Sequence, residues 1–293
     1  MDWQHISRHI SEATGEPFAV ARAESVGGGC INSAWRLRGE QGRDYFVKGN
    51  SADGLEMFAA EAEGLAEMAA AGAVRVPRPV CHGTAGGQAY LVMEWIDMGG
   101  GGAGARLGRE LAAMHRATRD RFGWHRDNTI GATPQPNTWS DDWVAFWREH
   151  RLGFQLQLAA RNGAPRAVVD KGERLQADLD AFFTDYRPVP SLLHGDLWGG
   201  NQGVARTGEP VIFDPAVYYG DREADLAMTE LFGGFGRDFH AAYDEAWPRD
   251  PGYAVRKTLY NLYHILNHYN LFGGGYAGQA GTMLDRLLAE LRG

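Results

Sequence analysis

A run of five glycines within six residues, GGGGAG over 99–104, divides this 293-residue chain into two stretches of different character. Glycine loses more backbone freedom on folding than any other residue, so such a run is typical of a linker rather than of a helix or strand. The stretch before it carries strand patterns around one long helical segment, and the stretch after it is mostly helical. We therefore predict a bilobal α+β fold, with an N-terminal lobe over 1–96 and a larger C-terminal lobe over 97–293.

The N-terminal stretch alternates between the two kinds of periodicity. Apolar residues spaced by three and four predict helices, and alternating or β-branched runs bounded by glycine predict strands. The expected helices are 3–14 and 55–71, and the expected strands end at Val26 or cover 31–39, 43–49, 77–83 and 88–96. Gly72 is the expected stop of the second helix. The first three strands follow one another through tight connections, which indicates an antiparallel meander.

The C-terminal stretch is expected to be helical apart from short strands around its polar motifs. A possible N-cap, Ser140, precedes the second of its helices. The expected helices are 105–118, 141–163, 166–186, 222–232, 253–270 and 280–291, with a short strand at 210–214.

Composition and charge restrict the classes of partner. The net charge is −8 and no run of Lys and Arg interrupts it, which argues against a protein built to bind nucleic acid. No stretch is apolar for long enough to cross a membrane, and the first residues have no signal-peptide core. The two cysteines, Cys30 and Cys81, are not in a metal-ligand spacing. We expect a cytoplasmic protein with neither a nucleic-acid nor a membrane partner.

The motif HGDLWGGN, residues 194–201, carries the first chemical signal. Asp196 and Asn201 stand five positions apart in a segment too rich in glycine for a helix. A phosphoryl-transfer loop needs a carboxylate beside the acceptor hydroxyl and an amide oxygen for Mg²⁺, and D-x-x-x-x-N is the spacing of the kinase catalytic loop. Taken alone, the spacing fits a polar turn equally well. Asp214, which follows the strand-like VIF one short hairpin later, changes that balance because it stands where a kinase has its second metal ligand.

The first hundred residues contain candidates for the other half of an ATP site. Gly27, Gly28 and Gly29 lie between two expected strands, where bare backbone N–H groups can approach phosphates. Lys48 ends the third strand, the position of the phosphate-binding lysine in kinases. A partner carboxylate is expected on the next helix, and the helical phase favours Glu61, with Glu63 as the second choice.

The segment LVMEWID, 91–97, fits the last strand of that lobe passing into a hinge. Met93 is expected to lie behind the adenine, with the Glu94 carbonyl and the Ile96 N–H on its edge. These features follow one another in the chain order of a kinase. They are the glycine loop, the lysine, the helix glutamate, the hinge and the three polar residues of the second lobe. Together they predict a phosphotransferase that uses ATP and Mg²⁺, with Asp196 as the catalytic base and Asn201 and Asp214 as metal ligands.

Several longer strings carry a resemblance to a known family. They are GGGCINSAWRL, NTWSDDWVAFWREHRLGFQL, HGDLWGGN with FDPAVYYGDREADLAM, and LYHILNHYNLFGGGY, which together extend over nearly the whole chain. The layout resembles the protein-kinase-like fold, with Gly195 where protein kinases have arginine, and these strings resemble the fructosamine kinase (ketosamine-3-kinase) family. The resemblance implies ATP-dependent phosphorylation of the 3-hydroxyl of a ketosamine, either a small molecule or a glycated protein lysine, and hence a deglycating repair activity. In that interpretation Lys48, fixed by Glu61, binds the α- and β-phosphates.

The substrate side has a functional and a structural interpretation for each candidate. The Trp198 indole could cover a sugar or pack the loop onto the helical lobe, and His264 and His268, on one helix face, could line the substrate site or be satisfied core groups. Asp221 and Glu223, at a helix start, are expected to support the metal loop structurally. Cys30 lies in the glycine loop, where oxidation could distort ATP binding or where it could simply fill a tight turn.

Two other functions remain open on the sequence. An aminoglycoside- or choline-type phosphotransferase shares every feature up to the substrate pocket, although LYHILNHYNLFGGGY favours the fructosamine kinases. A non-catalytic ATP-binding pseudokinase is disfavoured because Lys48, Asp196, Asn201 and Asp214 are all present. We expect a monomer or a weak homodimer.

Overall fold

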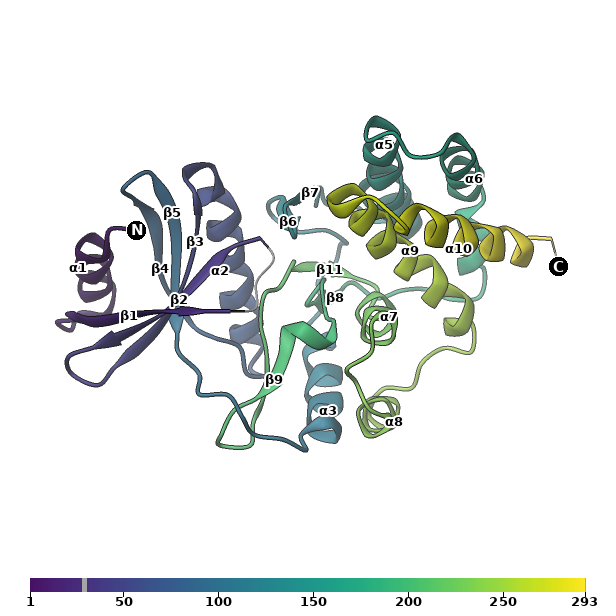
Figure 1. Ribbon diagram of the computed structural model, residues 1–293. Coiled ribbons are helices and arrows are strands. Elements are labelled where there is room, and N and C mark those ends of the chain that lie inside the picture. The colour runs from purple at the N-terminus through teal and green to yellow at the C-terminus, as the bar shows by residue number, and fades with distance from the viewer. Residues whose placement is uncertain (28–30, 293) are drawn as a thin grey trace. The chain divides into compact units, whose positions relative to one another are not determined.

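The computed structural model describes residues 1–27 and 31–292 and divides them into two units (Figure 1). The first unit contains Met1–Ala103 with Gly203–Pro215, and the second contains Gly104–Gln202 with Ala216–Gly293. This division differs from the sequence-based boundary after Ile96. The reason is that the backbone N–H groups of Gly99 and Gly100 donate to the carbonyl of Val204, which ties the glycine run to a hairpin far along the chain.

The first unit is built on a five-stranded antiparallel sheet. Its strands are β1 (Val20–Val26), β2 (Ser33–Gly39), β3 (Asp44–Ser51), β4 (Pro79–Ala85) and β5 (Gln88–Glu94), in the order β1-β2-β3-β5-β4. The first three strands form the meander that the turns predict, and β5 then pairs with β3 so that Lys48 lies opposite Leu91. Because β3 and β5 are central, their side chains are the most buried of the sheet.

Two helices cover the sheet, one on each side (Figure 1). Helix α1 (Trp3–Thr14) is capped at its start by the Asp2 carboxylate and packs Ile6 and Ile10 against a core that includes Leu37, Val47 and Val92. The short η1 (Ala52–Gly54) leads into α2 (Leu55–Ala71), which ends at Gly72 in the left-handed conformation, as its sequence predicts. Helix α2 therefore stands directly after the strand that carries Lys48.

The hairpin that completes this unit comes from the second half of the chain. Strands β9 (Gln202–Val204) and β10 (Pro210–Ile212) pair with each other, and Arg75 joins them through an ion pair with Glu209. Residues 213–215 follow β10, so Asp214 belongs to the same unit as Lys48.

The second unit is mainly helical. Its helical segments are α3 (Gly104–His115), α4 (Trp143–Phe146), η2 (Trp147–Gly153), α5 (Phe154–Arg161), α6 (Arg166–Ala177), η3 (Leu179–Phe183), α7 (Glu223–Leu231), α8 (Arg237–Ala246), α9 (Tyr253–Phe272) and α10 (Tyr276–Glu290). The long α9 is buried along most of its length and contacts α5, α7 and α10.

Short strands hold the polar motifs of this unit. Strand β8 (Ser191–Leu193) pairs with β11 (Tyr218–Gly220), and β6 (Asn128–Ile130) pairs with β7 (Thr133–Gln135). The 3₁₀ turn η4 (Gly199–Asn201) closes the HGDLWGGN segment.

Three sequence-based expectations differ from the structure here. The helix expected from 141 begins after Asp142, whose carboxylate accepts the Ala145 N–H, whereas the Ser140 hydroxyl accepts the Asp142 N–H and caps nothing. The helix expected over 166–186 stops at Ala177 and continues as the 3₁₀ turn η3. Helix α8 has no counterpart in the sequence-based assignment.

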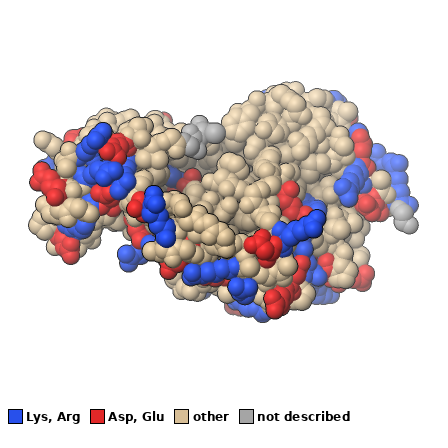
Figure 2. All heavy atoms as spheres, turned by 60° about the horizontal axis from the view of Figure 1, so that its bottom comes forward, with Lys and Arg blue, Asp and Glu red and all other residues tan. Residues whose placement is uncertain are grey.

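Charged side chains of both signs are intermingled on the face shown in Figure 2, with broad uncharged areas between them. On β1 and β2 the mixing is local, because Glu24 pairs with both Arg22 and Arg38. Among the described helices, none combines the length and the apolar character that crossing a lipid bilayer requires.

Candidate active site

The loop that follows β8 depends on a glycine. Gly195 has φ +83°, and a Cβ atom at this position would lie 2.0 Å from the carbonyl oxygen of Ala216. Any side chain would therefore collide with backbone, and the left-handed conformation would add strain. The loop can pass this close to the neighbouring chain, and present Asp196 after it, only with glycine at position 195.

A buried carboxylate forms hydrogen bonds with the backbone of the same loop. The Asp225 side chain, on α7, accepts the N–H of His194 at 2.7 Å and the N–H of Gly195 at 2.8 Å. His115, on α3, contacts the same carboxylate at 3.1 Å. Burial alone would raise the pKa of Asp225, but the bond from His115 and the nearby imidazoles outweigh it and hold the pKa below its usual value. Asp225 therefore anchors the loop. In the sequence it is one of the acidic residues in the first turn of an expected helix, and nothing in that pattern indicates an anchoring role.

His194, Asp196 and Asn201 are then joined within the loop. The Asp196 N–H donates to Nδ1 of His194 at 3.2 Å, so His194 braces the loop rather than facing outward. The Nδ2 of Asn201 donates to the Asp196 carbonyl at 2.9 Å and reaches one carboxylate oxygen of Asp196 at 3.4 Å. Asp196 is half-buried and Asn201 buried. The structure thus brings together the two residues that the D-x-x-x-x-N spacing singles out.

A second cluster lies in the first unit. The Lys48 ammonium is 2.6 Å from Oε1 of Glu61 and 2.6 Å from Oδ1 of Asp214, and its side chain is only 7% exposed. Burial disfavours the charge of Lys48, yet the two carboxylates outweigh burial and raise its pKa well above the usual value. Lys48 is therefore a permanent cation, and Glu61, not Glu63, is the helix carboxylate that contacts it.

Asp214 has an unusual backbone. Its φ of 58° makes it the one non-glycine residue with a positive φ among residues 1–27 and 31–292. Such conformations cost about 1–3 kcal/mol and persist where the surroundings impose them, often at functional sites. Asp214 adopts this conformation two residues after the end of β10, and its carboxylate contacts Lys48.

The predicted adenine-binding residues lie at the end of β5. Met93 is buried in the sheet, Glu94 ends the strand with its carboxylate paired to Arg75, and Ile96 follows half-buried. Gly27 follows β1, and the position of a Cβ there is open space. Gly28, Gly29 and Cys30 lie outside the described residues, so the predictions made for them stay predictions.

The predicted substrate residues differ in exposure. Trp198 is 41% exposed and lies over Gly200, where an added Cβ would meet the indole ring. His264 is 5% exposed, its Nδ1 has no hydrogen-bond partner among the described residues, and burial lowers its pKa to about 3. His268 is half-buried and its Nδ1 bonds to the His264 carbonyl at 2.7 Å.

A buried polar network supports the C-terminal helices. The Asp221 carboxylate accepts the hydroxyl of Tyr186 at 2.8 Å and the N–H of Glu223 at 3.0 Å. Glu223 pairs with Arg256 at 2.7 Å. Both carboxylates are fully buried in these contacts. Their partners lie in the helical part of the unit, so the support of the metal loop expected for Asp221 and Glu223 stays a prediction.

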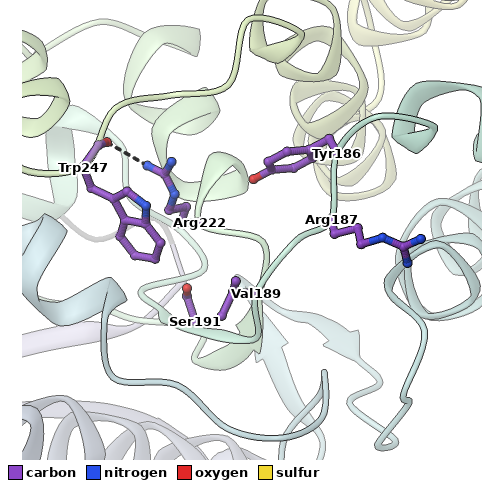
Figure 3. A pocket seen from close by; sticks show the side chains of 6 residues that line it. All are labelled: Tyr186, Arg187, Val189, Ser191, Arg222 and Trp247. Carbon is purple, nitrogen blue, oxygen red and sulfur yellow. Dashed lines mark hydrogen bonds between the residues drawn. The ribbon is translucent and has the colours of Figure 1, made fainter.

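A cavity of about 120 Å³ lies beside this network, and Figure 3 shows its lining. Arg222 lies along the Trp247 ring, Ser191 and Val189 lie on the other side, and Arg187 points away. The Arg222 guanidinium donates to the carbonyls of Trp247 and Pro248, so it ties the start of α7 to the end of α8. The cavity does not include Asp196, and we assign Arg222 a structural role.

Comparison with known proteins identifies the family. The sequence profile of the fructosamine kinases matches residues 2–290. The chain belongs to this family. As a fructosamine kinase it is a phosphotransferase for which ATP is a substrate, and the family assignment made from the motifs is confirmed.

Two curated relatives and one solved structure show the extent of the similarity. A Synechocystis protein named "Probable ketoamine kinase slr1563" is 54% identical, with 98% of this chain and 97% of that protein covered. The chloroplastic protein-ribulosamine 3-kinase of Arabidopsis thaliana is 46% identical over 95% of this chain and 86% of its own length. The crystal structure of a candidate fructosamine-3-kinase from Haemophilus somnus superposes with a TM-score of 0.90 at 29% identity, covering 98% and 97% of the two chains.

More distant structures share the fold alone. The amicoumacin kinase hAmiN, 14% identical, reaches a TM-score of 0.61 over 99% of this chain and 94% of its own. The α+β protein-kinase-like fold predicted from the motif order is therefore confirmed.

Proposed function

We propose that this fructosamine kinase transfers the γ-phosphoryl group of ATP, with Mg²⁺, to the 3-hydroxyl of ketosamines such as fructosamines and ribulosamines. The acceptor is either a small ketosamine or a glycated lysine of a protein, and the outcome is deglycation. The observation that carries the proposal is the pairing of Asp196 with Asn201 on a loop anchored by Asp225. The names of the relatives supply the substrate class.

Each polar residue then has a role that its contacts support. Asp196, three residues beyond the end of the buried strand β8, accepts the proton of the attacking hydroxyl and orients it. Lys48, held by Glu61, neutralises the α- and β-phosphates with a charge that persists at every physiological pH. Met93, the Glu94 carbonyl and the Ile96 N–H receive the adenine, and the backbone of Gly27, Gly28 and Gly29 receives the phosphates.

The metal side of the proposal rests on the chemistry of the donor set. Mg²⁺ prefers hard oxygen ligands, takes few from the protein and takes the others from water and phosphate. The Asp214 carboxylate and the Asn201 amide oxygen fit that preference, and among the described residues no cluster of three His, Cys, Asp or Glu offers a dedicated metal cage. When bound, Mg²⁺ neutralises charge that develops on the phosphates.

Replacing Asp196 by asparagine tests the base. Turnover of ribulosyl-lysine, measured as ADP release, should fall by about 10²–10⁴-fold because proton acceptance is lost. Mg²⁺-ATP binding, measured by calorimetry, should stay close to that of the wild type. Asp285→Asn, an exposed carboxylate paired with Lys171, is the matched control and should keep full activity. An Asp196→Asn enzyme with normal turnover would refute the assignment.

A substrate panel tests the class of acceptor. Ribulosyl-lysine, fructosyl-lysine, kanamycin and choline should be compared by kcat/KM, and we expect turnover of the two ketosamines only. Phosphorylation of kanamycin or choline without either ketosamine would favour the aminoglycoside- or choline-type alternative.

We also propose a cytoplasmic monomer or weak homodimer, without a nucleic-acid or membrane partner. Support comes from the low cysteine content and the acidic net charge of −8. Cell fractionation and size-exclusion chromatography with light scattering test these points. The Arabidopsis relative, by contrast, is named as chloroplastic.

A further inference from the structure

A continuous row of aromatic rings begins two residues beyond Asp196. The Trp198 ring meets Phe232 edge-on at 6.5 Å between centroids, and Phe232 lies 5.0 Å from His268. His268 in turn contacts Phe272 at 5.8 Å and Tyr276 at 5.3 Å. We call these five residues the aromatic strip. They come from the catalytic loop, the end of α7, α9 and α10, so four separate segments of the second unit converge on it.

The strip is unusually exposed for its composition. Among the described residues five large apolar side chains are exposed, and three of them are Trp198 at 41%, Phe232 at 42% and Phe272 at 56%. Single exposed apolar residues are ordinary on a protein surface, but contiguous ones mark a binding surface. The solvent-exposed rings of the strip are contiguous through His268.

Two glycines of the catalytic loop, Gly199 and Gly200, allow parts of the strip to pack closely against the loop. A Cβ at Gly199 would lie 2.8 Å from the carbonyl oxygen of Gly233 and 3.0 Å from Cα of Gly234, so the segment after Phe232 rests directly on the loop backbone. A Cβ at Gly200 would lie 2.2 Å from the Trp198 ring, so one face of the indole is supported from beneath. Trp198 and the segment after Phe232 therefore both lie against the loop that carries Asp196.

The central ring of the strip also offers a defined hydrogen-bond acceptor. Since Nδ1 of His268 lies 2.7 Å from the His264 carbonyl oxygen, which can only accept, Nδ1 carries the proton. In the neutral ring Nε2 is then an acceptor, and among the described residues no hydrogen bond to it is found. None of the five residues is Lys or Arg, so the strip itself carries no permanent positive charge.

We propose that the aromatic strip binds the amine arm of the ketosamine, which is attached to C1 of the sugar, two carbons away from the C3 that carries the reacting hydroxyl. This rests on the proposed function. The amine arm of a glycated lysine is a secondary ammonium followed by four methylenes and a peptide. An ammonium suits an aromatic face and the His268 acceptor, and methylenes suit the exposed rings of Phe232 and Phe272. With Asp196 at the sugar, the strip gives the arm a path across the surface of the second unit.

The test compares N-methyl-ribulosamine with N-hexyl-ribulosamine, which differ only in the length of the arm. The wild type should show a kcat/KM about ten-fold higher for the hexyl compound, because burying two methylenes already gives that factor. In Phe232→Ser and in Phe272→Ser the ratio of the two kcat/KM values should fall toward one. In Phe272→Leu, which keeps an apolar side chain at this position, the ratio should stay close to that of the wild type. Val189→Ser, which removes an apolar side chain 46% exposed elsewhere in the unit, should keep the wild-type ratio.

The hydrogen-bond acceptor of the strip, Nε2 of His268, is tested by a separate variant. His268→Phe keeps a ring in the strip but removes the acceptor, so kcat/KM should fall about ten-fold for both amines while their ratio stays. A wild-type ratio of one, or a ratio unchanged in the Phe232→Ser/Phe272→Ser double variant, would overturn the strip while leaving the kinase activity intact. Failure of the wild type to phosphorylate either amine would overturn the proposed function and the strip together.

Discussion

At the scale of single residues, Asp225 anchors the candidate loop from a position outside it, on α7. One carboxylate satisfies two backbone N–H groups and an imidazole in a place without access to water. An Asp225→Asn side chain has a single oxygen, so one buried donor loses its acceptor and meets an amide N–H₂ instead. Leaving a buried donor unsatisfied costs about 1–3 kcal/mol.

We therefore expect Asp225→Asn to lower the free energy of unfolding by about 3 kcal/mol at most and to lower kcat by displacing Asp196. Urea unfolding and steady-state kinetics measure the two effects. Glu110→Gln, on α3, which breaks an (i, i+4) ion pair with Arg106, is the control and should cost about 1 kcal/mol or less. Equal losses in the two variants would contradict the anchoring role of Asp225.

His264 gives a residue-scale prediction for pH. Burial lowers its pKa in the folded protein to about 3, with a smaller effect of His268 in the same direction. The unfolded chain binds a proton near pH 6.5 and the folded chain does not, so stability falls as pH decreases from 6.5 toward 3. Between pH 6.5 and pH 5 this group should remove about 2 kcal/mol from the free energy of unfolding.

His264→Gln isolates that contribution. The carboxylates titrate in both proteins, so the difference between their urea-unfolding curves across pH 5–8 reports on His264 alone. The variant should lose less stability on acidification than the wild type does. Parallel pH dependences would show that His264 is not buried in its neutral form.

At the scale of elements, apolar periodicity and residues typical of helix ends suffice to predict helices and strands where the two signals agree. The apolar spacing predicts the helices 3–14 and 55–71, and Gly72 is the predicted stop of the second. In the structure both helices end at a glycine in the left-handed conformation. The strand carrying Lys48 and the helix carrying Glu61 follow each other with a short turn, so their contact could also be predicted.

Where local signals compete, sequence reasoning fails for identifiable reasons. Ser140 and Asp142 are both good N-cap residues, and only the structure shows that Asp142 is the one used. Helix α8, which the sequence-based assignment lacks, directly follows a glycine-rich segment, although its buried residues Phe239, Ala242 and Tyr243 have the i, i+3, i+4 spacing of a helix. Asp225 and the aromatic strip join residues far apart in the chain, for which a single sequence contains no spacing rule.

The helix start after Asp142 gives a prediction for one element. Asp142→Ala removes the carboxylate that caps the Ala145 N–H and should cost about 1 kcal/mol of stability. Ser140→Ala removes only a local turn contact and should cost a few tenths of that. Thermal unfolding of the two variants decides the assignment, and the opposite order would restore Ser140 as the cap.

At the scale of the whole molecule, each of the two units contains its own part of the proposed machinery. Lys48, Glu61 and Asp214 belong to the first, and Asp196 and Asn201 belong to the second. Nucleotide binding and acceptor activation are therefore separable by mutation. Replacing Lys48 or Asp214 in the first unit should lower the affinity for ATP. Asp196→Asn in the second unit should lose turnover and keep the ATP affinity of the wild type.

Thermal stabilisation by Mg²⁺-ATP measures this separation in the intact chain. A ligand at one hundred times its Kd raises the free energy of unfolding by about 2.7 kcal/mol. We expect that gain in the wild type and in Asp196→Asn, and a much smaller gain in Lys48→Met and Asp214→Asn. Lys257→Met, which removes a partly exposed lysine paired with Glu230 in the second unit, is the matched control and should respond as the wild type does. A full ATP response in Lys48→Met would contradict the role of this buried lysine as the phosphate ligand, because methionine supplies no positive charge to the phosphates.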